Sequence, residues 1–502
     1  MAVETELKLS ISSERLDRLK RHPLLRKLAV SRASNNKLYS VYYDTPSLDL
    51  RGHAMALRLR RAGKQWLQTL KGGGGVQAGL HQRNEWEMPV AGEALELDAL
   101  KAAGGELPRG VRKDLQPVFV TDFSRNMRLL KFEGAEIELC MDQGEVRTEQ
   151  HSFPICELEL ELKSGKPRKL FELALALLDI VPFELETVSK AEQGYRLLSG
   201  YNDAPVKGSA PQLDKADTLM EVLQTLVWSC LQHLQGNLHG AMHGDDAEYL
   251  HQMRVALRRL RVVLRLAAKV HLDAELASLS SEVAALCVAL GRIREWDVFI
   301  AETVGPMCAR MPGDGGVQAL MAASEQRRTG RYEALRSETQ ARELQRLILR
   351  FAIWMNGPYW QQDGDQLRAC DFATRRLRKL SKRFDQAGLQ LNGLEAEQLH
   401  ALRILAKKLR YSAEFFAGLY DKQQTKSFLA ALSEVQDVLG QINDVAVAHR
   451  LLDELAEAPA LSAHQDAIGV VRDWIARSQP HQYAALRKSI RRFRKQPAFW
   501  GK

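Results

Sequence analysis

The first ten residues, MAVETELKLS (1–10), carry the pattern that decides the fold of the N-terminal part of the chain. Glu4, Glu6 and Lys8 alternate with apolar residues, and successive side chains of a strand point to opposite faces. One face therefore carries two carboxylates and an ammonium group. The side chains that we expect to pack behind it are Val3, Leu7 and Leu9. Because burying an unpaired charge is costly, the charged face has to meet counter-charges, metal ions or a polyanion.

Alternating segments of this kind recur up to about residue 200, at 37–43, 54–61, 65–71, 81–90, 117–132, 135–141 and 155–163. Two stretches with glycine, 71–75 and 142–144, are typical of turns between strands. Together with the first strand, these segments make about eight strands, which is enough to close an antiparallel barrel. Two segments with helical periodicity, 13–28 and 166–178, flank the strands.

Charged residues fall repeatedly on one face of these predicted strands. They are Arg58 and Arg60; Arg83, Glu85 and Glu87; Glu136 and Glu138; and Glu157, Glu159, Glu161 and Lys163, with Lys71, Arg125 and Lys190 as further basic positions. On any single strand, the simplest interpretation is that such a charged face is exposed to solvent. Their repetition around a barrel instead predicts a polar tunnel, with glutamates on one wall and basic residues on another. The apolar faces would then be covered from outside by the helices and the neighbouring domain.

Arginine and lysine side chains that converge in such a tunnel suit a chain of phosphates, because arginine offers a bidentate fork and lysine a point charge. Carboxylates in the same tunnel would repel phosphate unless hard divalent cations bridge the two. Mg²⁺ or Mn²⁺ with oxygen ligands is the natural choice. The residues therefore predict metal-dependent phosphoryl transfer.

The hydrophobic pattern of the sequence changes after residue 201. Residues 202–217 contain two prolines, a glycine and a serine and are predicted to be a linker. Residues 218–502 show long segments of 3.6-residue periodicity. The fold class is therefore α+β: an eight-stranded antiparallel barrel with flanking helices in 1–201, then an all-α domain. Of the net charge of +9, residues 1–200 contribute little, with 30 basic and 28 acidic residues, so the helical part carries most of the excess.

The helical part contains an internal repeat, in which HQMRVALRRLR (251–261) returns as HALRILAKKLR (400–410). The matched positions are His251, Arg254, Arg258 and Arg261 in the first copy and His400, Arg403, Lys407 and Arg410 in the second. Their spacing places each set on one helical face. Gly291 and Gly440 each follow forty residues after their histidine. The repeat predicts two related helical bundles, at about 218–370 and 371–502, with basic stretches at 375–383 and 487–495 that extend the basic surface.

The ordered series of charged strands in residues 1–200 resembles the CYTH proteins, the triphosphate tunnel metalloenzymes. This resemblance implies hydrolysis of a triphosphate with Mg²⁺ or Mn²⁺, and catalytic roles for Glu4, Glu6 and Lys8. The metal ligands that it implies are Glu4, Glu6, Glu157 and Glu159. The phosphate-binding residues that it implies are Lys8, Arg58, Arg60, Lys71, Arg83, Arg125, Lys163 and Lys190. Glu136, Glu138 and Glu161 are candidates for outer-shell partners.

The helical repeat resembles the CHAD domain, which accompanies CYTH domains and is associated with binding of inorganic polyphosphate. The resemblance covers about residues 218–500. It implies that the eight matched positions bind polyphosphate: His251, Arg254, Arg258, Arg261, His400, Arg403, Lys407 and Arg410. Lys407 stands where the first copy has Arg258, which should weaken bidentate phosphate contact in the second copy.

These observations favour a cytoplasmic inorganic triphosphatase that cleaves tripolyphosphate to pyrophosphate and phosphate and binds long-chain polyphosphate through its helical domain. The alternatives are a thiamine or nucleoside triphosphatase, an adenylate cyclase of the same tunnel family, and a non-catalytic polyphosphate-binding protein. Nucleic acid is a less favoured partner, because the basic helices lack interleaved aromatic residues. No apolar run approaches the roughly 20 residues of a membrane span, so we expect no membrane partner. Six cysteines without a CxxC pair argue against a zinc site.

Overall fold

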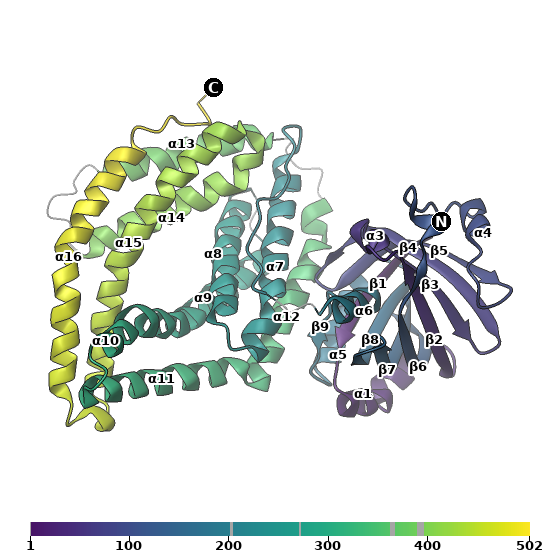
Figure 1. Cartoon of the computed structure of the whole chain (residues 1–502). Coiled ribbons are helices and arrows are strands. Elements are labelled where there is room, and N and C mark those ends of the chain that lie inside the picture. The colour runs from purple at the N-terminus through teal and green to yellow at the C-terminus, as the bar shows by residue number, and fades with distance from the viewer. Residues whose placement is uncertain (1, 201–203, 271–272, 362–366, 389–395, 502) are drawn as a thin grey trace. The chain divides into compact units, whose positions relative to one another are not determined.

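The computed structural model describes residues 2–200, 204–270, 273–361, 367–388 and 396–501. The chain forms two compact units, shown in Figure 1. The first comprises Met1–Ala204 and Glu338–Tyr359, and the second comprises Pro205–Ser337 and Trp360–Lys502. The first unit contains the strands and the second is helical, as the sequence predicted.

The strands of the first unit close into an antiparallel barrel, in the order β1-β5-β4-β3-β2-β6-β7-β8 and back to β1. The short β9 pairs with the end of β1, on the edge of β1 opposite β8. Their bounds are β1 Ala2–Ser10, β2 Ser34–Asp44, β3 Met55–Ala62, β4 Gln65–Gln77, β5 Leu80–Val90, β6 Gln116–Phe132, β7 Ala135–Arg147, β8 Ser152–Ser164 and β9 Glu184–Leu185. The eight-stranded barrel confirms the predicted fold.

Both predicted turns lie inside strands, so that part of the prediction was wrong. The glycine run of 72–75 belongs to β4 and forms an irregularity opposite β5, where Gly74 has φ +79° and a Cβ atom would lie 1.8 Å from the Gln82 carbonyl oxygen. Gly144 belongs to β7, and a Cβ atom there would lie 2.2 Å from the Asp122 carbonyl oxygen on β6. These glycines permit close backbone approach within the sheet instead of ending a strand.

The outer, apolar face of the barrel is covered by helices, above all by α5 (Arg168–Leu178), which buries six apolar side chains and contacts β1 and β8. The predicted helix at 13–28 is two helices, α1 (Ser13–Lys20) and α2 (Pro23–Leu28), because Pro23 interrupts the first and starts the second. Val3 is 60% exposed, so the expectation that it packs in the core was wrong, whereas Leu7 and Leu9 are fully buried. The remaining short helices are α3 Asp49–Gly52, α4 Leu97–Ala102, η1 Val111–Lys113 and α6 Lys190–Ser199.

A helix from far along the sequence, α12 (Glu338–Met355), also belongs to the first unit. It packs on α5, and its Gln345 side chain accepts a hydrogen bond from the backbone N–H of Leu185 at 3.1 Å. Arg346 forms an ion pair with Asp179 at 2.8 Å. The sequence-based boundaries had assigned this helix to the helical domain, so the two units interleave along the chain.

The second unit consists of long helices. Their bounds are α7 Leu219–His243, α8 Ala247–Val270, α9 Ala274–Phe299, η2 Ile300–Val304, α10 Gly305–Arg310, α11 Gly315–Arg336, α13 Ala369–Ala387, α14 Ala396–Phe416, η4 Ala417–Leu419, α15 Lys422–Ala456, η5 Pro459–Leu461 and α16 Gln465–Phe493. The short η3, Pro358–Gln361, lies where the chain passes between the units. One shared core joins the two repeats, with Trp296 and Phe299 from α9, Leu452 from α15 and Val471 from α16.

The starts of the two repeats are linked reciprocally. The Leu219 N–H donates to the Leu367 carbonyl, and the Ala369 N–H donates to the Asp217 carbonyl. α7 and α13 therefore begin side by side, and each precedes a helix with the repeated basic motif, α8 or α14.

By length and composition alone, the helical stretch Ala274–Arg310 could cross a membrane, so the expectation that no apolar run approaches that length was wrong. One such stretch is weak evidence, because core helices of water-soluble proteins have the same composition. Leu276, Val283 and Leu290 of this stretch are fully buried in the helical unit.

Candidate functional site

The register of the barrel strands brings the charged faces predicted from the sequence into one interior pocket. In the strand register, Lys8 of β1 lies opposite Glu159 of β8, and Arg125 of β6 lies opposite Asp142 of β7. The pocket is lined by Glu4, Glu6, Lys8, Tyr42, Ala56, Arg58, Arg60, Lys71, Arg83, Arg125, Glu159, Glu161, Ser189, Lys190 and Ala191. Carboxylates and basic groups therefore face one enclosed space, as the alternation predicted.

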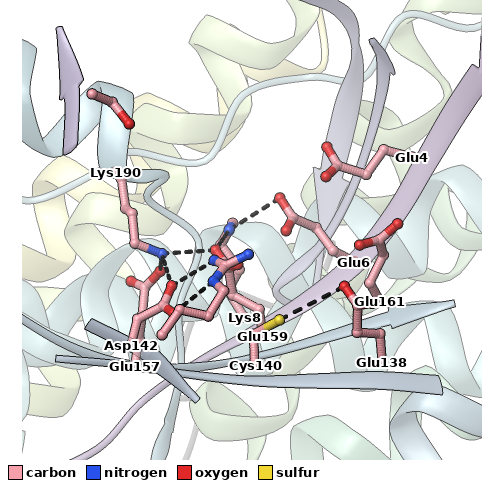
Figure 2. A network of polar contacts seen from close by, with 12 residues as sticks. Glu4, Glu6, Lys8, Glu138, Cys140, Asp142, Glu157, Glu159, Glu161 and Lys190 are labelled. Atoms are coloured by element: carbon pink, nitrogen blue, oxygen red, sulfur yellow. Dashed lines mark hydrogen bonds and ion pairs between the residues drawn. The ribbon is translucent and has the colours of Figure 1, made fainter. Parts of the chain in front are cut away.

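The floor network of this pocket centres on Lys190, the first residue of α6, whose N-cap is Ser189. The Lys190 Nζ atom lies 2.6 Å from Asp142 Oδ2 and 2.9 Å from Glu159 Oε1, and it also contacts Glu157. Arg125 binds Asp142 with two nitrogens, at 2.6 and 2.8 Å, and also contacts Glu159. Figure 2 shows Asp142 and Glu157 gathered around the Lys190 ammonium group. Together with Lys8, which also contacts Glu159, Lys190 and Arg125 thus match the three buried carboxylates.

The electrostatics of the floor network follow from this pairing. Burial alone would lower the pKa of Lys8, but the carboxylates of Glu159 and Glu6 outweigh it and raise that pKa well above its usual value. Burial raises the pKa of Glu157 to about 7, although Lys190 and Lys8 oppose the shift. The pKa of Glu6 falls to about 2, because Lys8 at 3.0 Å outweighs the effect of burial. Glu6 is therefore ionised at neutral pH.

On the opposite wall, Lys71 contacts Glu4 and lies 3.3 Å from Glu85. Arg58 lies 3.8 Å from both Glu85 and Glu87, which is too long for a direct hydrogen bond. Arg60 donates to the Ser40 hydroxyl at 3.0 Å, and its pKa falls to about 10 through burial and through the neighbouring Arg58. The guanidinium groups of Arg58 and Arg60 are therefore close, buried and only loosely paired, which favours an anion between them.

Two predicted site residues do not line the pocket. Glu157 lies in the floor network behind it, and Lys163 is partly exposed, 2.6 Å from Glu161 and 3.6 Å from Glu138. Their predicted roles stay predictions.

The sequence analysis missed Asp142, Tyr42 and Ser189. Asp142 was taken as part of a turn, although it continues the period-two series of Glu136 and Glu138 along β7. Tyr42 lies on β2 beside Arg58 and Arg60, whose charges lower its pKa against the effect of burial. Extending the alternation of the predicted strand 135–141 by one residue would have found Asp142, whereas Tyr42 already lay inside the predicted strand 37–43 and was missed because only charged residues were followed.

Two groups of carboxylates could hold a divalent metal ion, and the group of Glu4, Glu6 and Glu161 suits one better than the group of Asp142, Glu157 and Glu159. Asp142, Glu157 and Glu159 have oxygens within 4.8 Å of one another, but their charges are already matched by Lys190, Arg125 and Lys8. Glu4, Glu6 and Glu161 lie together at the other side of the network in Figure 2 and line the pocket. Burial and neighbouring carboxylates raise the pKa of Glu4 and of Glu161. Each of these three carboxylates is paired with one lysine, whereas Glu159 contacts three cations, so the charge here is less fully matched and the oxygen ligands fit Mg²⁺ or Mn²⁺.

In the helical unit, the two copies of the basic motif meet in one place. The pKa of Lys407 falls to about 7, through burial and then through the positive charges of Arg403, Arg258 and Arg254. The Nε atoms of all three arginines are buried and have no hydrogen-bond partner among the described residues. We call Arg254, Arg258, Arg403 and Lys407 the composite basic cluster. Partly buried cations that oppose one another's charge in this way favour an anion between them.

The other predicted positions of the motif contribute unequally. His251 stays neutral at pH 7, because burial and Arg294 lower its pKa to about 4. His400 is exposed. Arg410 forms an ion pair with Glu414 at 2.7 Å and a hydrogen bond with Gln436. Arg261 lies beside Arg265 and Cys287, along α8 from the cluster.

The first unit is thus a closed antiparallel barrel whose interior pocket holds facing carboxylates and basic side chains. The second is a helical unit of two repeats whose basic motifs converge. A model of the CYTH domain matches residues 2–195, and a model of the CHAD domain matches residues 225–453. The chain thus belongs to the proteins that carry a CYTH domain followed by a CHAD domain.

Three known proteins are similar to this chain in sequence or structure. An inorganic triphosphatase of Haemophilus influenzae is 34% identical over 201 residues, which are 39% of this chain and 55% of that protein, so the match spans about half of its length. An uncharacterized protein of Mycobacterium tuberculosis is 26% identical over 93% of this chain and 92% of its own. The crystal structure of the CHAD domain from the plant Ricinus communis is similar to 58% of this chain, over 97% of its own length, with 31% identity and a TM-score of 0.50.

Proposed function

We propose that the barrel is a divalent-metal-dependent triphosphatase that hydrolyses inorganic tripolyphosphate to pyrophosphate and phosphate. The observation that carries this proposal is the single pocket in which Glu4 and Glu6 face Arg58, Arg60 and Lys71. A pocket for a neutral ligand would gain nothing from so many buried cations, and a simple polyanion binder would gain nothing from carboxylates beside them. The similarity to an inorganic triphosphatase over the CYTH region supports the same reading.

The basic residues of the pocket bind the phosphate groups of the substrate. Arg58 and Arg60 offer paired guanidinium forks on one wall, and Lys8, Lys71 and Arg125 reach the pocket from other strands. Gathering them in one enclosed space neutralises the charge of a triphosphate and holds its terminal group in one orientation, which supplies most of the rate in phosphoryl transfer.

A divalent cation would be taken up by Glu4, Glu6 and Glu161, and it would supply charge neutralisation at the phosphates and polarisation of a water molecule. In the hydrolytic step, a water oxygen forms a bond to the terminal phosphorus, the bond from that phosphorus to the bridging oxygen breaks, and pyrophosphate leaves. Glu4 is suited to accept the proton of the water, because burial raises its pKa, whereas Glu6 stays ionised.

We propose that the helical unit binds long-chain polyphosphate at the composite basic cluster. The buried Nε atoms of its three arginines, which have no hydrogen-bond partner among the described residues, support this assignment, because phosphate oxygens would satisfy them. The α8, α13 and α14 helices expose no large aromatic side chain among their described residues, so stacking on nucleic acid bases is not supported.

The test measures phosphate and pyrophosphate release by the full-length protein from tripolyphosphate, ATP and thiamine triphosphate, with and without Mg²⁺. We expect metal-dependent phosphate release with tripolyphosphate preferred, lost in Glu6→Gln and retained in Glu145→Gln, a carboxylate of β7 outside the pocket. Preference for an organic triphosphate would identify the alternative triphosphatase, and pyrophosphate released from ATP without phosphate would identify a cyclase.

For the helical unit, the variant Arg258→Gln with Arg403→Gln is expected to lose long-chain polyphosphate binding in a filter or anisotropy assay. The matched control is Arg327→Gln with Arg477→Gln, two exposed arginines of the same unit outside the cluster. Equal binding by both variants would refute the assignment of the composite basic cluster.

A further inference from the structure

Beside the composite basic cluster, the second unit carries another group of basic side chains on a helix that has no part in the repeated motif. α13 holds six basic residues among its nineteen, at positions 375, 376, 378, 379, 382 and 383. Arg376, Lys379 and Arg383 follow the i, i+3, i+7 spacing of one helical face. α13 packs against α14, which carries half of the composite basic cluster.

This face of α13 meets basic residues from both motif helices. Lys269, at the end of α8, has its pKa lowered by partial burial and then by Arg376, Lys379 and Arg383. Lys408 of α14 has its pKa lowered by partial burial and then by four arginines, two of them Arg376 and Arg383. Three helices thus direct like charges toward one another, an arrangement that costs free energy unless an anion lies between them.

The like charges are also left without carboxylate partners. Within the described residues, no Asp or Glu oxygen is found within 4.0 Å of Lys269, Arg376, Lys379, Arg383 or Lys408. The Nε atom of Arg376 is buried and lacks a hydrogen-bond partner. By contrast, other basic residues of this unit pair with acids, for example Arg328 with Asp297 at 2.8 Å and Arg450 with Glu295 at 2.5 Å.

The fold itself does not require these charges. α7 stands in the first repeat where α13 stands in the second, and its 25 residues include neither lysine nor arginine. The two helices begin side by side through the reciprocal hydrogen bonds at 217–219 and 367–369. Since the same architectural position carries no lysine or arginine in one repeat, the two-repeat fold does not require the basic residues of α13.

We propose that the helical unit has a second phosphate-binding subsite, which holds a part of a polyphosphate chain beyond the part held by the composite basic cluster. The residues of this α13 subsite are Arg376, Lys379 and Arg383 of α13, Lys269 of α8 and Lys408 of α14. The inference rests on the proposed binding of polyphosphate by the helical unit and extends it to chain-length selectivity.

The two sites are joined by a continuous basic path along α8. Arg254, Arg258, Arg261 and Arg265 all act on the Cys287 thiol of α9, so they lie along one side of α8. Lys269 lies fifteen residues after Arg254, which is about 22 Å at 1.5 Å per residue. Lys407 and Lys408 are neighbours on α14, so the two sites adjoin there, but a short anion such as tripolyphosphate cannot contact both Arg254 and Lys269. A long chain can span that distance and gain affinity from simultaneous contact.

The experiment uses the full-length protein with Arg58→Gln and Arg60→Gln in every arm, so that the barrel pocket does not contribute. Polyphosphate fractions of increasing mean length, tripolyphosphate and single-stranded DNA of matched charge are titrated at several salt concentrations. The subsite variant is Arg376→Gln, Lys379→Gln and Arg383→Gln. The control removes three charges from the adjacent, exposed face of the same helix: Arg375→Gln, Arg378→Gln and Lys382→Gln.

We expect the subsite variant to keep tripolyphosphate binding and to lose about tenfold in affinity for long chains, with a shallower salt dependence than the control. Unchanged tripolyphosphate binding also shows that the variant is folded. Equal losses in the subsite and control variants, or a loss independent of chain length, would overturn the subsite. DNA bound as tightly as polyphosphate would overturn the choice of ligand. If the parent protein bound no long chains at all, the proposed function itself would fail, which is a distinguishable result.

Discussion

Replacement of Lys190 by methionine is expected to destabilise the barrel strongly, because one ammonium group is the shared partner of Asp142, Glu157 and Glu159. All three carboxylates are buried. Removing one partner of a buried ion pair costs on the order of 3–5 kcal/mol, since the other charge stays desolvated. Arg125 still neutralises Asp142 and Glu159, so we expect a loss near the lower end, about 3 kcal/mol, that falls mainly on Glu157.

The loss should depend on pH with a definite sign. Burial already raises the pKa of Glu157 to about 7 with Lys190 present, and removal of the ammonium group raises it further. The folded variant then holds a proton that the unfolded chain, with the ordinary glutamate pKa of 4.5, has released. The contribution of Glu157 to the stability of the variant is therefore fully present below about pH 4.5 and is lost as the pH rises through 7 and above.

The matched control is Lys163→Met, because Lys163 is half-exposed and pairs with Glu161 and Glu138 on the same barrel. That exchange is expected to cost at most about 1 kcal/mol. Hydrogen exchange of peptides from β7 and β8 in increasing urea measures the barrel separately from the helical unit. Equal losses for the two variants, or a Lys190→Met loss that is independent of pH, would refute the reasoning.

Three further predictions address function and domain structure. Glu6→Gln should lower the kcat of tripolyphosphate hydrolysis at least about a hundredfold with a smaller change in KM. Arg58→Ala should lower kcat and raise KM. An unchanged kcat in Glu6→Gln would rule out a catalytic role for the Glu4 and Glu6 wall. The affinity for polyphosphate should rise as the pH falls from 8 to 6, because Lys407, with a pKa near 7, gains its charge in that range. The affinity should change by at most about tenfold per pH unit. In Lys407→Gln this pH dependence should be absent. Ending the chain at Ser209 should lower the midpoint of barrel unfolding, because it removes α12 from α5; a midpoint equal to that of the barrel in the full chain would show that α12 adds no stability.

The barrel and its charged interior were predictable because strand alternation is a local property. A period of two assigns each side chain to a face without knowledge of any partner strand, and this rule correctly placed Glu4, Glu6, Lys8, Arg58 and Arg60 on the inner face. The same rule would have found Asp142, had the Asp-Gln-Gly sequence not been taken as a turn. Gly144 serves the close approach of β6 instead, which depends on a strand that comes earlier in the chain.

The repeated basic motif was likewise predictable, because helical periodicity assigns residues 251–261 and 400–410 to one face of each helix. What the sequence by itself determined about this protein is therefore which residues share a face and which chemistry those faces suit.

Only the tertiary structure decided which faces meet. The floor network joins Asp142 of β7, Glu157 and Glu159 of β8 and Lys190 of α6, because antiparallel register brings distant residues opposite one another. The composite basic cluster exists because α8 and α14 converge, which no single repeat specifies. The place of α12 on α5 follows from buried apolar contact across more than 150 residues of sequence. Pairing of this kind is set by the global burial of apolar surface and the matching of buried charge, whereas the period of a strand or helix is set by the local backbone.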